Sequence, residues 1–92
     1  MELATKRLTL TGDVVANSGF VFAAHYAGRL DLAGRYQTSP NGETIIELRG
    51  APELIDMFEI AFWLGPSDAM IDSISVEDVE NPNWNTKGFV KV

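Results

Sequence analysis

The sequence predicts an α+β protein in which two helices cover one face of a mostly antiparallel sheet. Three observations predict this two-layer sandwich. Segments with the period of a strand and segments with the period of a helix follow each other in the order β-α-β-β-α-β. Each helical segment is about twelve residues long, which is long enough to cross a sheet. A turn sequence, Asn41-Gly42, lies between the two central strand segments.

The first strand is predicted over residues 6–12, where Leu8 and Leu10 alternate with polar residues. From Phe20 the apolar spacing changes to three and four, which places these residues on one face of a helix. The residues of this face are Phe22, Ala23, Tyr26, Ala27 and Leu30. Asn17 or Ser18 is expected to cap the helix, and Gly34 follows its end.

A β-hairpin is predicted in the middle of the chain. Residues 35–38 and 43–49 are rich in β-forming residues and flank the turn at 39–42. In this turn, Asn41-Gly42 is expected to supply the positive φ angles of a tight hairpin.

The second helix is predicted from Pro52 to about Leu64. Proline is tolerated in a first helical turn, and Glu53 and Asp56 complement the positive end of the helix dipole. Gly65-Pro66 is expected to end the helix through a left-handed glycine cap, followed by a turn at 67–68.

The last third of the chain is predicted to hold two strands. Residues 69–77 carry Ile71, Ile74 and Val76 in a pattern that fits a loop entry and a fourth strand. Residues 78–87 are expected to be a loop, and residues 89–92 a short final strand. The complete order is that of the split-βαβ, ferredoxin-like sandwich.

Composition indicates that residues 1–92 form a single domain. Apolar residues make up 46% of the chain and charged residues 22%, an ordinary globular mixture. The chain has no cysteine, which excludes disulfides, thiol catalysis and cysteine metal sites. The acidic third that contains Asp68, Asp72, Glu77, Asp78 and Glu80 lacks the spacing of a calcium loop and is interpreted as a solvated surface.

The net charge of −6 argues against binding to nucleic acid or to anionic membrane surfaces, because both would be repelled. The first seven residues have no apolar core of signal-peptide length, and no segment approaches the length of a membrane span. We therefore expect a cytoplasmic protein that binds neither nucleic acid nor membrane.

The stretch from Leu8 to Phe22 combines a strand, a segment with two glycines and a helix start. Unpaired amides at a helix start favour anions, and glycine lets a loop approach a ligand closely. This predicts a site for a small anion such as phosphate. Its residues are Ala16, Asn17, Ser18, Gly19, Phe20 and Val21.

Five short motifs, in this order and spacing, resemble those of the acylphosphatase family. They are the segment from Gly12 to Gly19-Phe20, then Leu30-Asp31-Leu32-Ala33-Gly34, Pro40-Asn41-Gly42, Gly50-Ala51-Pro52-Glu53, and Phe58 with Trp63-Leu64-Gly65-Pro66. The resemblance covers nearly the whole chain. It implies an α/β sandwich enzyme that hydrolyses carboxyl-phosphate anhydrides and uses no metal or organic cofactor.

The family's two catalytic residues do not match. An arginine directly after the Gly-Phe binds the phosphate, and an asparagine before the hairpin turn orients the water; here these positions hold Val21 and Thr38. A gapless alignment would instead place Phe20 at the arginine position. Neither alignment supplies a guanidinium, and losing such an arginine can cost about a thousandfold or more in rate. Thr38 retains a hydroxyl that could hold a water.

Other candidates have simpler interpretations. Lys6, Arg7, Arg29 and Arg35 are interpreted as solvated surface charges, none of them obviously placed to replace the missing arginine. His25, the only histidine, has no nucleophile or metal-ligand partner at a useful spacing, so we interpret it as an ordinary helix residue rather than a general base.

The second helix is apolar almost all round, although a helix that lies on a sheet needs only one apolar stripe. The surplus is expected among Ile55, Ile60 and Phe62. It indicates a protein partner or a homodimer, unless a loop such as the one bearing Trp84 covers it.

Three hypotheses follow. The first is a non-catalytic acylphosphatase-like domain that acts by binding an anion or a protein. The second is an active acylphosphatase with an atypical site. The third is an interaction domain without a small ligand.

Overall fold

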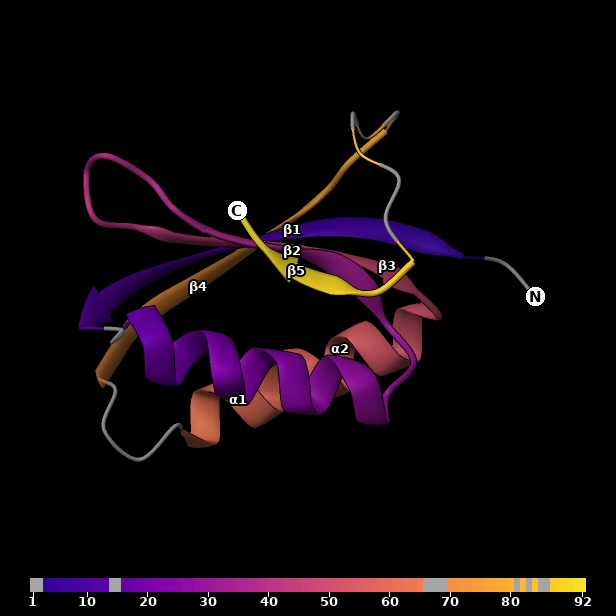
Figure 1. The fold of residues 1–92 in the computed structure, drawn as a ribbon, viewed down its shortest axis with the longest axis horizontal. Helices are drawn as coiled ribbons and strands as arrows, with labels where there is room; N and C mark the ends of the chain where they lie inside the picture. The colour runs from indigo at the N-terminus through magenta and orange to yellow at the C-terminus, as the bar shows by residue number, and fades with distance from the viewer. Residues whose placement is uncertain (1–2, 14–15, 66–69, 81, 83, 85–86) are drawn as a thin grey trace.

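The structure is a computed structural model that describes residues 3–13, 16–65, 70–80, 82, 84 and 87–92. Five strands and two helices lie in this part of the chain (Figure 1). They are β1 (Ala4–Asp13), α1 (Ala16–Arg29), β2 (Ala33–Thr38), β3 (Thr44–Gly50), α2 (Pro52–Leu64), β4 (Met70–Asp78) and β5 (Phe89–Lys91). The sheet has the order β4-β1-β3-β2-β5 and is antiparallel except between β2 and β5. The predicted ferredoxin-like α+β sandwich is confirmed.

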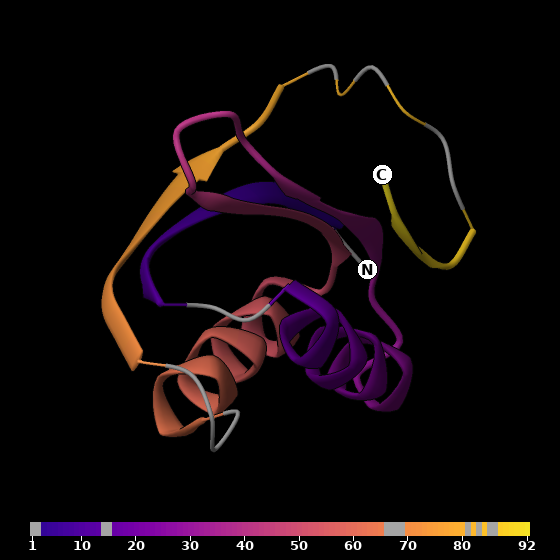
Figure 2. The same cartoon turned by 60° about the vertical axis from the view of Figure 1, so that its left-hand side comes forward.

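Both helices lie on the same face of the sheet, and no helix among the described residues covers the opposite face (Figure 2). The alternation in the strands explains this, since Leu8 and Leu10 of β1, Gly34 and Tyr36 of β2 and every second residue of β3 are buried toward the helices. The largest fully buried side chains are Tyr36, Phe58, Phe62, Leu8, Leu10, Ile46, Leu48 and Ile55. We call the helix-free side the open face.

β1 is longer than predicted because it pairs with two neighbours. It runs from Ala4 to Asp13 and lies between β3 and β4. Gly12 forms an irregularity in the pairing with β4 and has φ +117°. A Cβ at Gly12 would lie 2.3 Å from the carbonyl oxygen of Met70. This glycine is therefore required by the strand pairing and is not part of a ligand loop.

α1 ends at Arg29, and Asp31, not Gly34, is the left-handed residue that follows its end, which corrects the predicted cap. Asp31 has φ +55°, the Leu32 N–H donates to the Ala27 carbonyl at 2.8 Å, and the Asp31 N–H donates to Gly28 at 3.4 Å. These two bonds form a Schellman motif. Gly34 lies inside β2 instead, where a Cβ would stand 2.0 Å from the carbonyl oxygen of Glu47.

The β2–β3 hairpin is confirmed, but its turn differs from the prediction. The Gly42 N–H donates to the Ser39 carbonyl at 3.0 Å, so Pro40 and Asn41 are the central turn residues. Gly42 has φ +89°, whereas Asn41 is not in the positive-φ region. Proline fixes φ near −65° at the first central position, which excludes the primed turn that Asn-Gly alone predicted.

α2 has the predicted bounds, and Gly65 ends it. The Gly65 N–H donates to the Phe62 carbonyl at 3.3 Å, with φ +143° and ψ 153°. This conformation needs glycine but is extended rather than the left-handed cap that was predicted. The predicted role of Pro66, the turn at 67–68 and the strand start at Ala69 lie outside the described residues.

Candidate site at the start of α1

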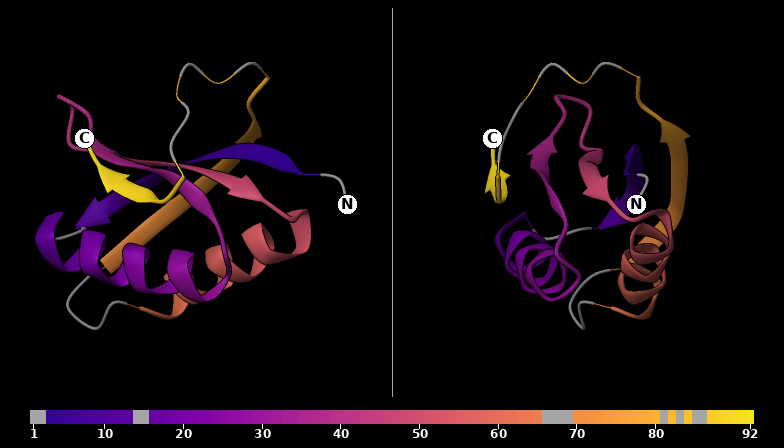
Figure 3. Two further views of the ribbon diagram at one scale, coloured as in Figure 1. Left: turned by 45° about the vertical axis from the view of Figure 1, so that its right-hand side comes forward. Right: turned by 90° about the vertical axis from the view of Figure 1, so that its right-hand side faces the viewer.

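Three predicted features meet at one end of the sandwich (Figure 3). β1 ends at Asp13, β2 ends at Thr38, and α1 begins at Ala16. The register brings the strand ends together, because Thr44 pairs with Thr38 on one side and with Leu10 on the other. The start of α1 and the hairpin therefore lie at the same end of the strands.

The predicted anion loop is helical in the structure. Residues 16–21 form the beginning of α1, so Asn17 and Ser18 lie inside the helix and neither can be its cap. Gly19 is buried in the same helix. A helix that starts at Ala16 leaves the amides of residues 16–19 without partners in the helix, while those of Phe20 and Val21 point to carbonyls one turn back. Within the described residues, α1 can therefore offer an anion only the amides of its first turn.

Phe20 and Val21 have opposite environments. The Phe20 ring stacks on Phe89 with centroids 5.9 Å apart and meets Tyr36 edge-on at 5.7 Å. Val21 is 66% exposed. A phosphate-binding arginine must reach solvent, so the outward position is the one that Val21 holds. This geometry favours the alignment that places Val21, rather than Phe20, at the arginine position.

Thr38 is exposed at the last position of β2. Residues two apart on a strand share a face, so Thr38 lies on the same face as Tyr36, toward the helices. Both predicted substitutions thus lie at this end of the fold. Each offers a small side chain without charge.

Tyr36 is a buried polar residue that the sequence did not single out. Its side chain is fully buried, and its hydroxyl makes no hydrogen bond to the residues that the structure describes. Burial raises the pKa of Tyr36, and the nearby Thr44 hydroxyl offsets part of this rise. Tyr36 fits the alternation of β2 as an apolar residue would. The sequence pattern therefore could not indicate that its hydroxyl is buried without a hydrogen bond to the described residues.

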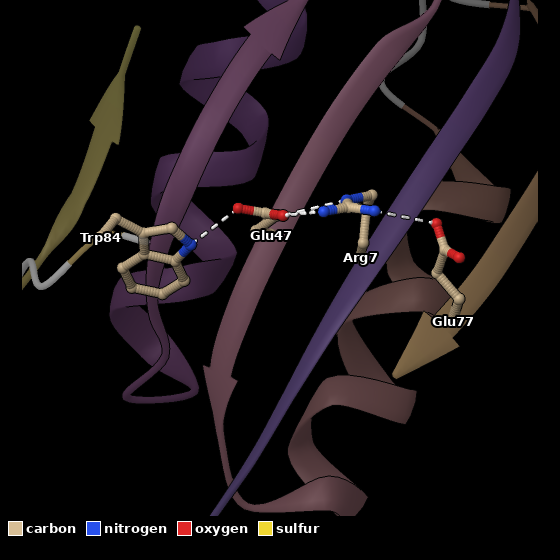
Figure 4. Close-up of polar contacts among 4 residues, drawn as sticks. All are labelled: Arg7, Glu47, Glu77 and Trp84. Atoms are coloured by element: carbon tan, nitrogen blue, oxygen red, sulfur yellow. Dashed lines mark hydrogen bonds and ion pairs between the residues drawn. The ribbon is translucent and has the colours of Figure 1, made fainter. Parts of the chain in front are cut away.

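The arginines do not serve this end of α1. Arg7, predicted as a solvated charge, instead lies on the open face and binds two carboxylates (Figure 4). Its guanidinium lies 2.9 Å from Glu47 and 3.2 Å from Glu77. The hydrogen bond to Glu47 raises the pKa of Arg7. Glu77 is therefore ion-paired, while its side chain stays 61% exposed, in keeping with its interpretation as part of a solvated acidic surface.

Trp84 completes this network on the open face. Its indole N–H donates to Glu47 at 2.7 Å, and the Glu47 side chain is only 13% exposed (Figure 4). Trp84 therefore cannot be the cover that was considered for α2, which packs on the other face. The network joins β1, β3, β4 and the connection before β5. Only the register of the strands reveals it.

The same face has a depression of about 460 Å³ with mixed charge. Arg7 and Arg35 line it together with Glu43, Glu47 and Glu77. Two cations among three carboxylates give no clear preference for an anion. Arg35 is therefore on the wrong side of the sheet to replace the missing guanidinium, and Arg29 lies in the last turn of α1.

His25 and the acidic residues show no catalytic or metal arrangement within the described part of the chain. His25 is exposed and contacts the ring of Tyr26 edge-on at 5.3 Å. The described residues include no group of three or more His, Asp or Glu side chains that could hold a metal. Asp68 lies outside them. No described helix is long and apolar enough to cross a membrane.

The exposed side of α2 differs in part from the prediction. Ile60 is exposed as expected, but Ile55 and Phe62 are buried in the core. Phe62 meets Phe22 of α1 edge-on at 5.1 Å, which explains its burial. The other exposed apolar residues of the helix are Met57, Trp63 and Leu64.

Known structures share this fold over the whole chain. No protein-family model matches the sequence, and no curated protein sequence matches it significantly. The acylphosphatase from Bacillus subtilis superimposes with a TM-score of 0.85 at 22% identity, with 99% of each chain covered. The acylphosphatase from Coxiella burnetii gives 0.85 at 18% identity, with 98% of this chain and 93% of that chain covered.

A larger protein contains a similar unit. Full-length HypF, solved in its phosphate- and nucleotide-bound form, matches with a TM-score of 0.82 at 26% identity. The match covers 99% of this chain and 12% of HypF. Together with the element order and the site geometry, these likenesses show that the chain has the acylphosphatase fold.

Proposed function

We propose that the chain is a single, non-catalytic acylphosphatase-like domain over residues 1–92 that binds a small anion, phosphate or an acyl phosphate, at the first turn of α1. The observation that carries this proposal is the exposed Val21. Its position resembles that of the family's phosphate-binding arginine, yet valine offers neither a charge nor a donor. We place the domain in the cytoplasm as part of the same proposal.

The chemistry supports binding rather than hydrolysis. Hydrolysis of an acyl phosphate needs a positioned water and stabilisation of charge spread over the phosphoryl oxygens. The described arginines are Arg7, Arg29, Arg35 and Arg49. Arg7 and Arg35 lie on the open face, Arg29 lies in the last turn of α1, and Arg49 pairs with Ala33, at the other end of β2 from Thr38. The first-turn amides of α1 remain as donors for an anion. They hold an anion in the ground state without supplying the arginine's contribution to the transition state.

The direct test is hydrolysis of benzoyl phosphate by the purified chain. We expect no turnover above the uncatalysed rate. Turnover at ordinary enzyme rates would overturn the proposal in favour of the second candidate, an active acylphosphatase with an atypical site; the hydroxyl of Thr38 is the feature that favours this candidate.

The double variant Val21→Arg with Thr38→Asn tests the geometry. We expect it to gain hydrolysis of benzoyl phosphate, because it restores a guanidinium and an amide at the two positions. The matched control is His25→Arg with Thr38→Asn, which places the same guanidinium one turn further along the same exposed side of α1. Equal activity in both double variants would contradict the assignment of Val21.

Anion binding is tested by titrating the ¹⁵N-labelled chain with inorganic phosphate. We expect the amide resonances of residues 16–19 to shift at millimolar phosphate, with smaller shifts beyond Val21. Unchanged resonances in a folded chain would remove the anion site and favour the third hypothesis, a domain without a small ligand.

A further inference from the structure

We propose that the outer face of α2 docks a short, basic, amphipathic segment of a partner protein. This outer face consists of Glu53, Asp56, Met57, Ile60, Trp63 and Leu64, all exposed. Their spacing of three and four places them on one stripe of the helix. The opposite stripe, with Ile55, Phe58 and Phe62, is buried against the sheet. The fold is therefore satisfied without the outer face.

The outer face is divided into an acidic and an apolar half. Glu53 and Asp56 lie toward the start of α2, and the four apolar residues occupy the last two turns. Ile60 is 59% exposed and Leu64 85%. Four such side chains on neighbouring turns form a patch, unlike single exposed apolar residues, and such patches mark binding surfaces.

Trp63 lies in the apolar half of this surface. It is half exposed, and its indole N–H donates to Glu59, one turn earlier on the helix, at 3.4 Å. Tryptophan is among the side chains most enriched at the energetic centre of an interface.

Charge determines which partner fits. α2 carries three acidic residues, Glu53, Asp56 and Glu59, and no basic one, in a chain of net charge −6. Lysine and arginine can lay their aliphatic stems on apolar residues and place their charged ends on carboxylates. A partner with apolar anchors and a basic flank therefore matches both halves of the outer face.

A second copy of the chain matches it less well. The α2 helix of a second copy would bring three further carboxylates toward this surface, and neither copy of α2 carries a cation. Stable dimers also bury about 20–30 residues a side, far more than four apolar side chains. The outer face is the size of a peptide site, and helix-in-groove and helix-on-helix recognition use anchors at this spacing.

The test uses a synthetic peptide with leucine and lysine at helical spacing, LKKLLKLLKKLLKL, and the ¹⁵N-labelled full chain. We expect amide shifts centred on residues 53–64 and a change in Trp63 fluorescence, read in a Trp84→Phe background that leaves one tryptophan. The counterpart peptide with glutamate in place of lysine should not bind. Ile60→Ser, which adds no charge, should weaken the lysine peptide by about tenfold or more, as expected for a central anchor.

A pair of charge variants separates docking from general attraction to an acidic protein. Glu53→Lys with Asp56→Lys changes the net charge by the same amount as Asp78→Lys with Glu80→Lys, whose positions are exposed at the end of β4 and just after it. The first pair should weaken binding by about fivefold or more and the second by less than about twofold, because local charge dominates at contact distance. Equal effects would overturn the proposal.

Three further outcomes are decisive. If the chain alone sediments as a dimer that Ile60→Asp dissociates, the outer face binds a second copy and the basic partner is excluded. The docking surface rests on the proposed function only in that the domain acts by binding. If the unmodified chain does not bind the peptide but phosphate still shifts the amides of residues 16–19, the docking site alone is overturned. If the unmodified chain hydrolyses benzoyl phosphate, the proposed function alone is overturned.

Discussion

The helix-covered face and the open face of the sheet are built from the same strands but are stabilised by different interactions. Under the helices, β1 and β3 contribute Leu8, Leu10, Ile46 and Leu48, all fully buried. On the open face the alternate positions carry Arg7 and Glu47. The carboxylate of Glu47 accepts hydrogen bonds from Arg7 and from Trp84. The covered face depends on packing, which tolerates few changes. The open face depends on a few polar contacts, each of which contributes little to stability.

The largest expected effect comes from the covered face. Phe58→Ala should lower the free energy of unfolding by about 3–5 kcal/mol, because it leaves a cavity between α2 and the sheet. Its control, Ile60→Ala, lies two residues further along the same helix but is exposed, and should change stability by less than about 0.5 kcal/mol. Urea unfolding followed by circular dichroism measures both. Similar losses would mean that the outer face of α2 is covered in the free protein.

The open face should be affected less. Trp84→Phe keeps an aromatic ring but removes the 2.7 Å hydrogen bond to Glu47. We expect a loss of about 1.5–2 kcal/mol, the lower part of the range for a bond to a charged group, because Trp84 is only partly buried. Trp63→Phe is the control, since its bond to the carboxylate of Glu59 is longer, at 3.4 Å, and exposed. It should cost less than about 0.5 kcal/mol. Equal losses in the same urea experiment would show that the open face gains no stability from Trp84.

Tyr36 tests the covered face where a polar atom interrupts it. Its hydroxyl is buried without a hydrogen bond to the described residues, so Tyr36→Phe should be neutral or stabilising by up to about 1 kcal/mol at pH 7. Burial raises the pKa of Tyr36, so the folded state holds the proton that the unfolded chain releases above about pH 10.

The pH dependence gives this prediction its sign. The stability of the unmodified chain should be complete with respect to this group below about pH 10 and should fall as the pH rises from there through the folded-state pKa. Tyr36→Phe should lack this part of the alkaline loss, whereas Tyr26→Phe, a control on α1, should retain it. Unfolding curves between pH 8 and 11 measure the difference. Parallel curves for both variants would contradict it.

The smallest effect is expected in the connection between α1 and β2, outside both faces. Asp31 has φ +55°, a conformation that glycine adopts without strain. Asp31→Gly should therefore raise the free energy of unfolding by about 0.5 kcal/mol. Glycine removes the left-handed strain of the folded state, but it also makes the unfolded chain more flexible, which cancels part of the gain. Asp31→Ala should not stabilise. A thermal melt of the three proteins ranks them, and a loss in the glycine variant would show that the aspartate side chain stabilises the cap.

The sequence predicted the covered face well because burial imposes a period. The core-facing side of each element determines its pattern of apolar residues. This explains the alternation of Leu8 and Leu10 and the spacing of Phe22 to Leu30. The bounds of α2 were correct because Pro52 and Gly65 act locally. The start of α1 was misplaced because Gly19 was interpreted as a loop residue, although it is buried in the helix.

The open face and the site depend on register and could not be predicted in the same way. Arg7 and Glu47 are 40 residues apart in the sequence and meet only because β1 pairs antiparallel with β3. Likewise, strand period alone cannot tell that Gly34 is needed for a close approach to Glu47. The anion site at residues 16–21 and the roles of Val21 and Thr38 stay predictions, since they depend on a ligand.

The position of β4 at the edge of the sheet has a consequence for solubility. β4 is nine residues long and pairs only with β1 in the described sheet, so one side of its backbone is open to a strand from another molecule. Asp72, Glu77 and Asp78 are exposed along it and repel an identical edge at neutral pH. Salt screens this repulsion, so it fades at high ionic strength. β4, as an edge strand, would then be the place at which the sheets of two molecules pair and aggregation begins.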